Sequence, residues 1–219
     1  MDRRRIVVVE DDPMTRGLLA DILEAAGFAV ASVSNGSDAR RACAIADPDG
    51  LVLDVDLGAG PTGFDVADAL LLEYPHLAIL FLTNLPDSRF AGRSASSLPS
   101  GAGYLRKEQL VQSGLLIETL DAVLRGQDVA SRRSDRDPGR PLASLSNTQI
   151  SVLRLVALGR TNQQIADERG TSARAVQTVI ARSMVALGIP EDAEGNVRVK
   201  AAREYMIAAG IPLARSSDA

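Results

Sequence analysis

Acidic, hydroxyl and amine side chains follow four short apolar runs in the first half of the chain. In chain order these side chains are Glu10, Asp11, Asp12, Asp54, Thr83 and Lys107. Carboxylates brought together from two segments can hold a hard cation such as Mg²⁺, which prefers oxygen ligands. An aspartate whose charge is offset by Mg²⁺ and a lysine can attack phosphorus, and a threonine hydroxyl can contact the phosphoryl oxygens. The pattern therefore predicts a phosphoryl-accepting site that uses Mg²⁺.

The apolar runs have the length and composition of strands buried on both faces of a parallel sheet. They are Ile6–Val9, Leu51–Leu53, Ala78–Leu82 and 103–106, with a further short strand expected at Ala29–Val33. Helical periodicity lies between them, at Thr15–Ala26, Ser37–Ala46, Phe64–Tyr74 and roughly Gln109–Leu124. This alternation predicts an α/β fold with a doubly wound parallel sheet. Ligands of such sheets bind beyond the carboxyl ends of the strands, where the charged side chains fall.

Each of these side chains has an ordinary structural explanation when it is taken alone. An acidic cluster at one strand end is commonly only solvated charge, and Thr83 or Lys107 could simply end a strand or begin a helix. Their joint placement at four strand ends favours the functional interpretation. Cys43 lies on the apolar side of its helix, so we expect it to be buried and inert.

The order of an acidic pair, an aspartate, a threonine and a lysine resembles the receiver domain of bacterial two-component response regulators. The resemblance covers about residues 4–125 and implies a flavodoxin-like sheet. It implies that Asp54 is the phosphoacceptor and that a sensor histidine kinase is the phosphoryl donor. Around Asp54 it implies three further ligands of Mg²⁺: Asp11 directly, Glu10 through water, and the backbone carbonyl of Asp56.

The same resemblance implies that Thr83 and Tyr104 are switch residues and that Lys107 pairs with the phosphate. Tyr104 taken alone fits packing as well as switching. Two segments depart from the family pattern. The loop after Asp54 is longer than the common form, with Pro61 displaced, and the stretch between Thr83 and Tyr104 is rich in Ser, Gly and Pro where the family usually has a helix. We therefore expect a weak or remodelled helix there, and with it an altered output face.

Helical patterns in the second half of the chain form a helix-turn-helix arrangement. The expected helices cover 147–158, Asn162–Glu168, Ala173–Leu187 and about Val197–Ala209. A short helix, a turn containing Gly170 and a longer helix are typical of this motif. The polar face of the longer helix carries Arg174, Gln177, Thr178 and Arg182. Arg suits guanine or phosphate, Gln suits adenine and the Thr methyl suits thymine, so this helix is predicted to read DNA.

Residues 144–210 resemble the LuxR-type (NarL/FixJ-type) output domain, a small all-α domain. The match includes the turn at 159–162 and a serine before the recognition helix. The resemblance adds Thr161, Asn162 and Ser172 to the expected DNA-binding residues. Gln177 stands where the family usually has a lysine, which predicts modest affinity for a single copy. We therefore expect a homodimer on DNA.

Composition divides the chain into an acidic front and a mildly basic back. Residues 1–126 hold 11 Lys and Arg against 18 Asp and Glu, whereas residues 144–219 hold 9 against 7. Residues 127–143 carry charges, Ser, Gly and Pro without apolar periodicity, which predicts a linker between a receiver at 1–126 and a DNA-binding domain at 144–219. One cysteine and one histidine exclude a Cys/His zinc site. No apolar run approaches the roughly 20 residues of a membrane span, so no membrane association and a cytoplasmic location are expected.

Together these features predict a transcription regulator, not an enzyme, in which phosphorylation of Asp54 controls binding to DNA. One alternative is a phosphorylation-independent transcription factor whose receiver serves as a dimerisation or partner platform, which the irregular stretch before Tyr104 favours. A second is a signalling adaptor whose helix-turn-helix binds protein. A hydrolase of the aspartyl-phosphate type is disfavoured, because only Asp56 could supply a second acid near Asp54.

Overall fold

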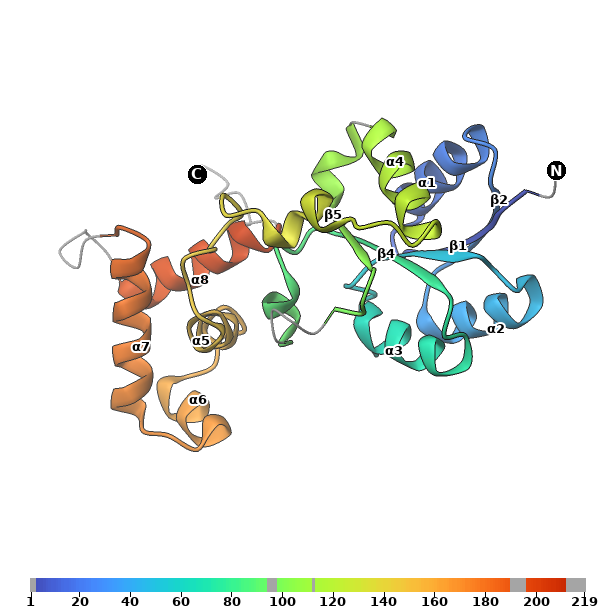
Figure 1. Cartoon of the computed structure of the whole chain (residues 1–219). Coiled ribbons are helices and arrows are strands. Elements are labelled where there is room, and N and C mark those ends of the chain that lie inside the picture. Colours follow the sequence, from blue (N-terminus) through green and yellow to red (C-terminus); the bar gives the residue numbers. More distant parts are fainter. Residues whose placement is uncertain (1–2, 94–97, 112, 190–195, 212–219) are drawn as a thin grey trace, which may run out of the picture. The chain divides into compact units, whose positions relative to one another are not determined.

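The computed structural model describes residues 3–93, 98–111, 113–189 and 196–211 (Figure 1). The chain divides into two compact units. The first is formed by Met1–Asn84 with Ser97–Asp137, and the second by Leu85–Ser96 with Pro138–Ala219. Each unit is described by itself below. No helix of the described residues is both long and apolar enough to cross a membrane.

The first unit is built on a five-stranded parallel sheet. Its strands are β1 (Arg5–Val9), β2 (Ala29–Val33), β3 (Gly50–Leu53), β4 (Ala78–Thr83) and β5 (Gly103–Arg106). They are arranged in the order β2-β1-β3-β4-β5, and every pair is parallel. The order reverses beside β1, as in other doubly wound sheets. The predicted fold class is therefore confirmed.

Four α-helices cover the two faces of this sheet. They are α1 (Pro13–Ala25), α2 (Gly36–Ala46), α3 (Gly63–Glu73) and α4 (Ser113–Leu124). In Figure 1, α1 and α4 lie on one face and α2 and α3 on the other. The buried residues of α1 are Leu19 and Leu23, which lie one turn apart and pack in the core with Ile6 and Val8 of β1. Leu18, the residue before Leu19, is half exposed because its side chain is turned away from the Leu19–Leu23 line.

The stretch between β4 and β5 lacks the usual α-helix in its described part. A single 3₁₀ turn, η1 (Ser88–Ala91), forms there, as the Ser-, Gly- and Pro-rich composition predicts. After β5 a second 3₁₀ turn, η2 (Lys107–Val111), precedes α4. The last helix of this unit therefore begins four residues later than the periodicity predicts.

The stretch expected to be a linker, residues 127–143, is ordered in part. It contains two 3₁₀ turns, η3 (Ala130–Arg132) and η4 (Ser134–Arg136). Val129 packs against Ala122 and Val123 of α4, and the Ser134 hydroxyl donates to Gln109 Oε1 at 2.6 Å. Residues 127–137 therefore belong to the first unit, whereas the predicted division left them outside both domains.

The second unit contains four further helices. They are α5 (Asn147–Ala157), α6 (Asn162–Arg169), α7 (Ala173–Ala186) and α8 (Val197–Ala208), close to the predicted ranges. Side-chain caps explain where three of them begin. Ser146 and Thr161 each form a capping box with a glutamine three residues later, and Ser172 caps α7. The helices enclose one core that includes Ile150, Ile165, Val176 and Ile180.

Candidate functional site

The amine of Lys107 joins two buried carboxylates at the carboxyl ends of the strands. Lys107 Nζ lies 2.6 Å from Asp54 Oδ2 and 2.7 Å from Glu10 Oε2. Glu10 follows β1, Asp54 follows β3 and Lys107 follows β5, two strands further along the sheet. The sequence predicts these residues at separate strand ends, and the parallel sheet brings them into contact.

Burial sets the electrostatics of this site. Desolvation raises the pKa of Glu10 to about 7, although the hydrogen bond from Lys107 acts in the opposite direction. Desolvation also raises the pKa of Asp54, against the charge of Lys107 and hydrogen bonds from Lys107, Asp56 and Thr83. Burial would lower the pKa of Lys107, but its two carboxylate partners outweigh it and the pKa is raised. The site therefore stabilises added positive charge.

Three carboxylates form a candidate cation site beside this lysine. Glu10, Asp11 and Asp54 each offer an oxygen, and these oxygens lie within 4.8 Å of one another. Asp11 is exposed, whereas the other two are buried. A compact all-oxygen set that includes two buried carboxylates of raised pKa fits Mg²⁺, which binds through carboxylates and keeps several waters. Asp56, the fourth expected ligand, donates its backbone N–H to Asp54 Oδ1 at 3.1 Å.

Arg16 supports this acidic site in a way that sequence reasoning missed. Its Nη1 donates to the backbone oxygens of Glu10, at 2.7 Å, and Asp11, at 3.1 Å. Asp12, the third acid of the cluster, caps α1 by accepting from the Thr15 N–H at 2.7 Å. The position of Arg16 one turn into a helix after the acids was the only available signal.

Gly63 is a second residue that sequence reasoning missed. It is the first residue of α3, and its N–H donates to the Val55 carbonyl at 2.9 Å. A Cβ added at Gly63 would lie 2.0 Å from the carbonyl oxygen of Asp54. The close approach of α3 to the candidate phosphoacceptor therefore requires glycine.

The two expected switch residues are both buried. Thr83 ends β4 with no exposed surface, and its hydroxyl is among the groups that hydrogen-bond Asp54. Tyr104 of β5 is also fully buried, with its ring centroid 6.4 Å from that of Phe81. Phe81 contacts Phe64 of α3 in turn, at 4.8 Å between centroids. In this structure Tyr104 is part of an aromatic cluster in the core.

The second unit presents a polar surface on α7. Arg174, Gln177, Thr178 and Arg182 are all exposed and line one shallow hollow along the helix. The opposite face of α7 buries Val176, Ile180 and Met184 in the core. Within this unit, the predicted DNA-reading face of α7 is therefore exposed. Apolar packing holds the opposite face of the helix against the core.

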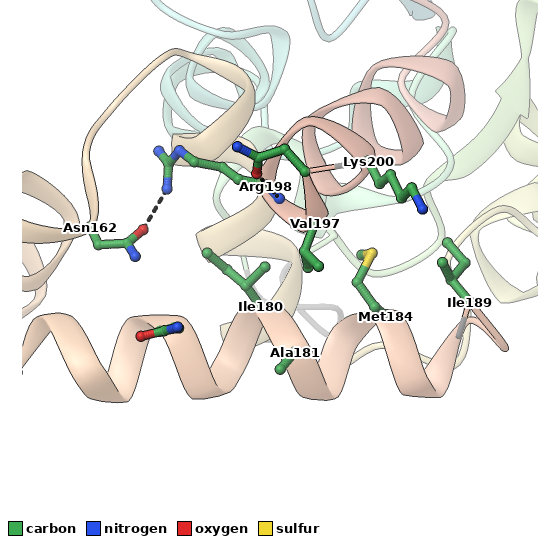
Figure 2. A pocket seen from close by; sticks show the side chains of 10 residues that line it. Asn162, Ile180, Ala181, Met184, Ile189, Val197, Arg198 and Lys200 are labelled. Atoms are coloured by element: carbon green, nitrogen blue, oxygen red, sulfur yellow. Dashed lines mark hydrogen bonds between the residues drawn. The ribbon is translucent and has the colours of Figure 1, made fainter. Parts of the chain in front are cut away.

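The residues added by the LuxR-type resemblance have structural roles in this unit. The side chains of Thr161 and Ser172 cap α6 and α7. Asn162 Oδ1 accepts a hydrogen bond from Arg198 of α8, drawn dashed in Figure 2. The pocket drawn there, of about 460 Å³, lies between α7 and α8, with Ile180 and Met184 pointing towards α8. The Asn162 side chain is thus bonded to α8.

Two family models match the chain. Residues 6–110 match the response regulator receiver domain, and residues 143–195 match the bacterial regulatory proteins of the luxR family. The chain therefore joins a response regulator receiver domain to a luxR-family domain. Response regulators with a luxR-family domain are transcription regulators, and receiver domains bind Mg²⁺ at an acidic pocket such as the one formed by Glu10, Asp11 and Asp54.

Individual proteins resemble this response regulator over most of its length. A nitrate/nitrite response regulator protein homolog of Haemophilus influenzae is 27% identical over 190 residues, 82% of this chain and 88% of the relative. The DNA-binding transcriptional activator DevR/DosR of Mycobacterium tuberculosis is 27% identical over 193 residues, 84% of this chain and 88% of the relative.

A solved structure shares the fold. It is RcsB from Salmonella enterica serovar Typhimurium bound to promoter rprA in the presence of phosphomimetic BeF3-, with a TM-score of 0.59 and 17% identity. The alignment covers 93% of this response regulator and 98% of that chain. At this identity the likeness supports the fold alone.

Proposed function

We propose that this response regulator accepts a phosphoryl group on Asp54 and that phosphorylation controls DNA binding by α7. The observation that carries the proposal is the contact of Lys107 Nζ with both Asp54 and Glu10, at 2.6 and 2.7 Å. An isolated buried carboxylate would be costly, whereas this one has a cation beside it and two further carboxylates for a metal. A sensor histidine kinase is the proposed phosphoryl donor.

In the proposed reaction an Asp54 oxygen attacks phosphorus, a new P–O bond forms, and the bond from phosphorus to the donor breaks. Phosphoryl transfer depends mainly on positioning and on stabilising charge. Lys107 holds one Asp54 oxygen and the Asp56 N–H holds the other, so the carboxylate is fixed in one orientation. Mg²⁺, when held by Glu10, Asp11 and Asp54, supplies positive charge next to the phosphoryl oxygens.

DNA is the proposed partner of the second unit, and a homodimer is the proposed binding form. The exposed Arg174, Gln177, Thr178 and Arg182 support DNA over protein, because they match base-edge and phosphate chemistry. A modest cationic face favours pairing of two copies on one site. Relatives described as DNA-binding activators support the same assignment.

Labelling with acetyl phosphate and Mg²⁺ tests the acceptor. We expect the wild-type chain to gain one phosphoryl group by intact-mass analysis and the Asp54→Asn variant to gain none. Asp21→Asn is the matched control, because Asp21 is an exposed acid of α1 away from the strand ends. Labelling that persists in Asp54→Asn would show that another residue is the acceptor.

A phosphorylation-independent transcription factor remains the second candidate. The observation that favours it is the replacement of the usual α-helix after β4 by the short η1 turn. Selection of bound DNA from random duplexes, with and without acetyl phosphate and Mg²⁺, separates the two. Equal affinity and equal sequence preference in both conditions would support the second candidate.

A further inference from the structure

A segment that follows β4 is packed inside the helical unit. Residues 86–90 are all buried, although they lie in a stretch rich in Ser, Gly and Pro. Phe90 and Leu85 pack in the same core as α5, α7 and α8, and the segment groups with the second unit. By sequence this segment falls within the receiver match, at 6–110, and outside the luxR-family match, at 143–195.

Phe90 makes the central apolar contact of this segment. It is 3% exposed, and its ring stacks on Tyr205 of α8 with centroids 5.1 Å apart and planes 22° apart. The Tyr205 hydroxyl donates to the Phe90 carbonyl at 3.1 Å. One residue is thus held through both its ring and its backbone, and an exposed loop would need neither contact.

A buried ion-pair cluster fixes the same segment beside α5. Asp87 Oδ2 lies 2.6 Å from Arg89 Nη2 and 2.8 Å from Arg140 Nε. The Arg89 guanidinium also donates to the backbone carbonyl of Leu145, just before the Ser146 cap of α5. Burial would raise the pKa of Asp87, but the hydrogen bonds from the two arginines hold it below its usual value.

These contacts hold the segment against α5 and α8, and both of these helices pack against α7. Helix α8 contacts both α5 and α7, and the Phe90–Tyr205 stack lies on α8. We infer that residues 85–93 form an integral element of the LuxR-type domain, which is therefore assembled from two separate stretches of the chain. This domain depends on Phe90 to hold α5 and α8 behind the reading helix. The surface formed by Tyr205, Arg140 and the Leu145 carbonyl is thus a docking surface whose partner is a segment of the same chain.

Hydrogen exchange of the full-length Phe90→Ala variant tests this inference. Removing the ring leaves a cavity in the core of the second unit. We expect backbone amides of α5 and α8 to exchange at least about tenfold faster than in the wild type, with those of β1 and β3 unchanged. Affinity for the selected DNA should fall at least about tenfold as well.

Phe28→Ala is the matched control, because Phe28 is a similarly buried phenylalanine in the core of the α/β unit. We expect it to speed exchange in α1 and β2 and to leave α5 and α8 unchanged. The inference is overturned if Phe90→Ala speeds exchange in β4 and β5 while α5 and α8 keep their wild-type protection.

Tyr205→Phe keeps the test valid if Phe90→Ala unfolds the whole chain. This variant removes only the hydroxyl that donates to the Phe90 carbonyl. We expect several-fold faster exchange at the amides of Phe90 and Gly92, which close the η1 turn on Asp87 and Arg89. Unchanged exchange at these amides would show that the segment does not depend on the helical core.

Discussion

Glu10 is a buried acid whose ionised form is disfavoured in the folded chain. Its pKa is about 7 in the folded state against an ordinary 4.5, so the folded chain holds a proton that the unfolded chain releases between these values. Stability is therefore highest at low pH within this window and falls as pH rises through it. A bound divalent cation would reverse the effect, because it favours the ionised carboxylate.

We therefore expect the thermal midpoint of the α/β unit, measured in EDTA, to fall between about pH 5 and pH 8. Addition of Mg²⁺ at pH 8 should raise the midpoint again, because it binds only the folded site. In Glu10→Gln the fall should be smaller, since glutamine does not titrate and only the raised pKa of Asp54 still acts in this direction. A midpoint that rises with pH, or the same fall in both proteins, would contradict the assignment of the pKa to Glu10.

Gly63 determines how two secondary-structure elements pack, because it lets the first turn of α3 approach the end of β3. A methyl group there would overlap the Asp54 carbonyl, 2.0 Å away. We expect Gly63→Ala to destabilise the α/β unit by about 1–3 kcal/mol, as overpacking does. Labelling of Asp54 by acetyl phosphate should slow with it, because the acceptor must move.

The matched control for Gly63 is Gly17→Ala in α1. Gly17 is exposed, helical and free of atoms within 4 Å of an added Cβ. Alanine should stabilise that helix by about 0.5–1 kcal/mol and leave labelling unchanged. Thermal unfolding and intact mass measure both variants, and equal effects at the two glycines would rule out a role for the α3–Asp54 contact.

Two residues of α7 are expected to contribute differently to DNA binding, one to general affinity and the other to base preference. We expect Arg182→Ala to weaken binding to all duplexes and to lower the salt slope by about 1, because it removes a phosphate contact. Gln177→Ala should instead relax the preference at one base pair, by about 1–3 kcal/mol of discrimination. Binding isotherms at several salt concentrations measure both, with Arg41→Ala, an exposed arginine of α2, as the control.

Unchanged binding in both α7 variants would reject this helix as the reader of DNA. Retention on DNA at low salt that falls steeply with added salt would exclude the adaptor, whose helix-turn-helix binds protein.

Elements and single residues differ in how far the sequence predicts them. Strands such as β1 and helices such as α7 follow from local pattern, so their positions were predicted to within a few residues. The meeting of Glu10, Asp54 and Lys107 followed from the rule that parallel strands share one carboxyl edge. The ion pairs themselves depend on side-chain rotamers and on burial, which no local sequence pattern predicts.

Residues 85–93 could not be placed from sequence for a different reason. Phe90 packs on Tyr205, 115 residues later, and Asp87 pairs with Arg140, 53 residues later. No periodicity within the segment encodes these partners. The composition predicted correctly that an ordinary helix is absent, but not where the side chains would pack.

At the scale of the whole molecule, the candidate switch and the helical core are one residue apart in the chain. Thr83 ends β4, and only Asn84 separates it from Leu85 of the packed segment. We expect acetyl phosphate with Mg²⁺ to alter hydrogen exchange in residues 85–93 and in α8 of the wild-type chain. The Asp54→Asn variant should show no such change.

This expectation rests on the proposed phosphorylation of Asp54, and intact mass measured on the same samples separates the two. A labelled chain with unchanged exchange in residues 85–93 would show that the signal takes another route. An unlabelled chain would refute the acceptor and leave the packing of the segment unaffected.

The packing of residues 85–93 in the second unit has a practical consequence for dissecting the protein. The backbone passes between the units on either side of this stretch and again after Asp137. A truncation beginning at residue 138 or 144 therefore discards Phe90, whose ring stacks on Tyr205. Chimeras that graft this output domain onto a foreign receiver will need to carry residues 85–93 with it, because the two halves of the chain are not freely exchangeable modules.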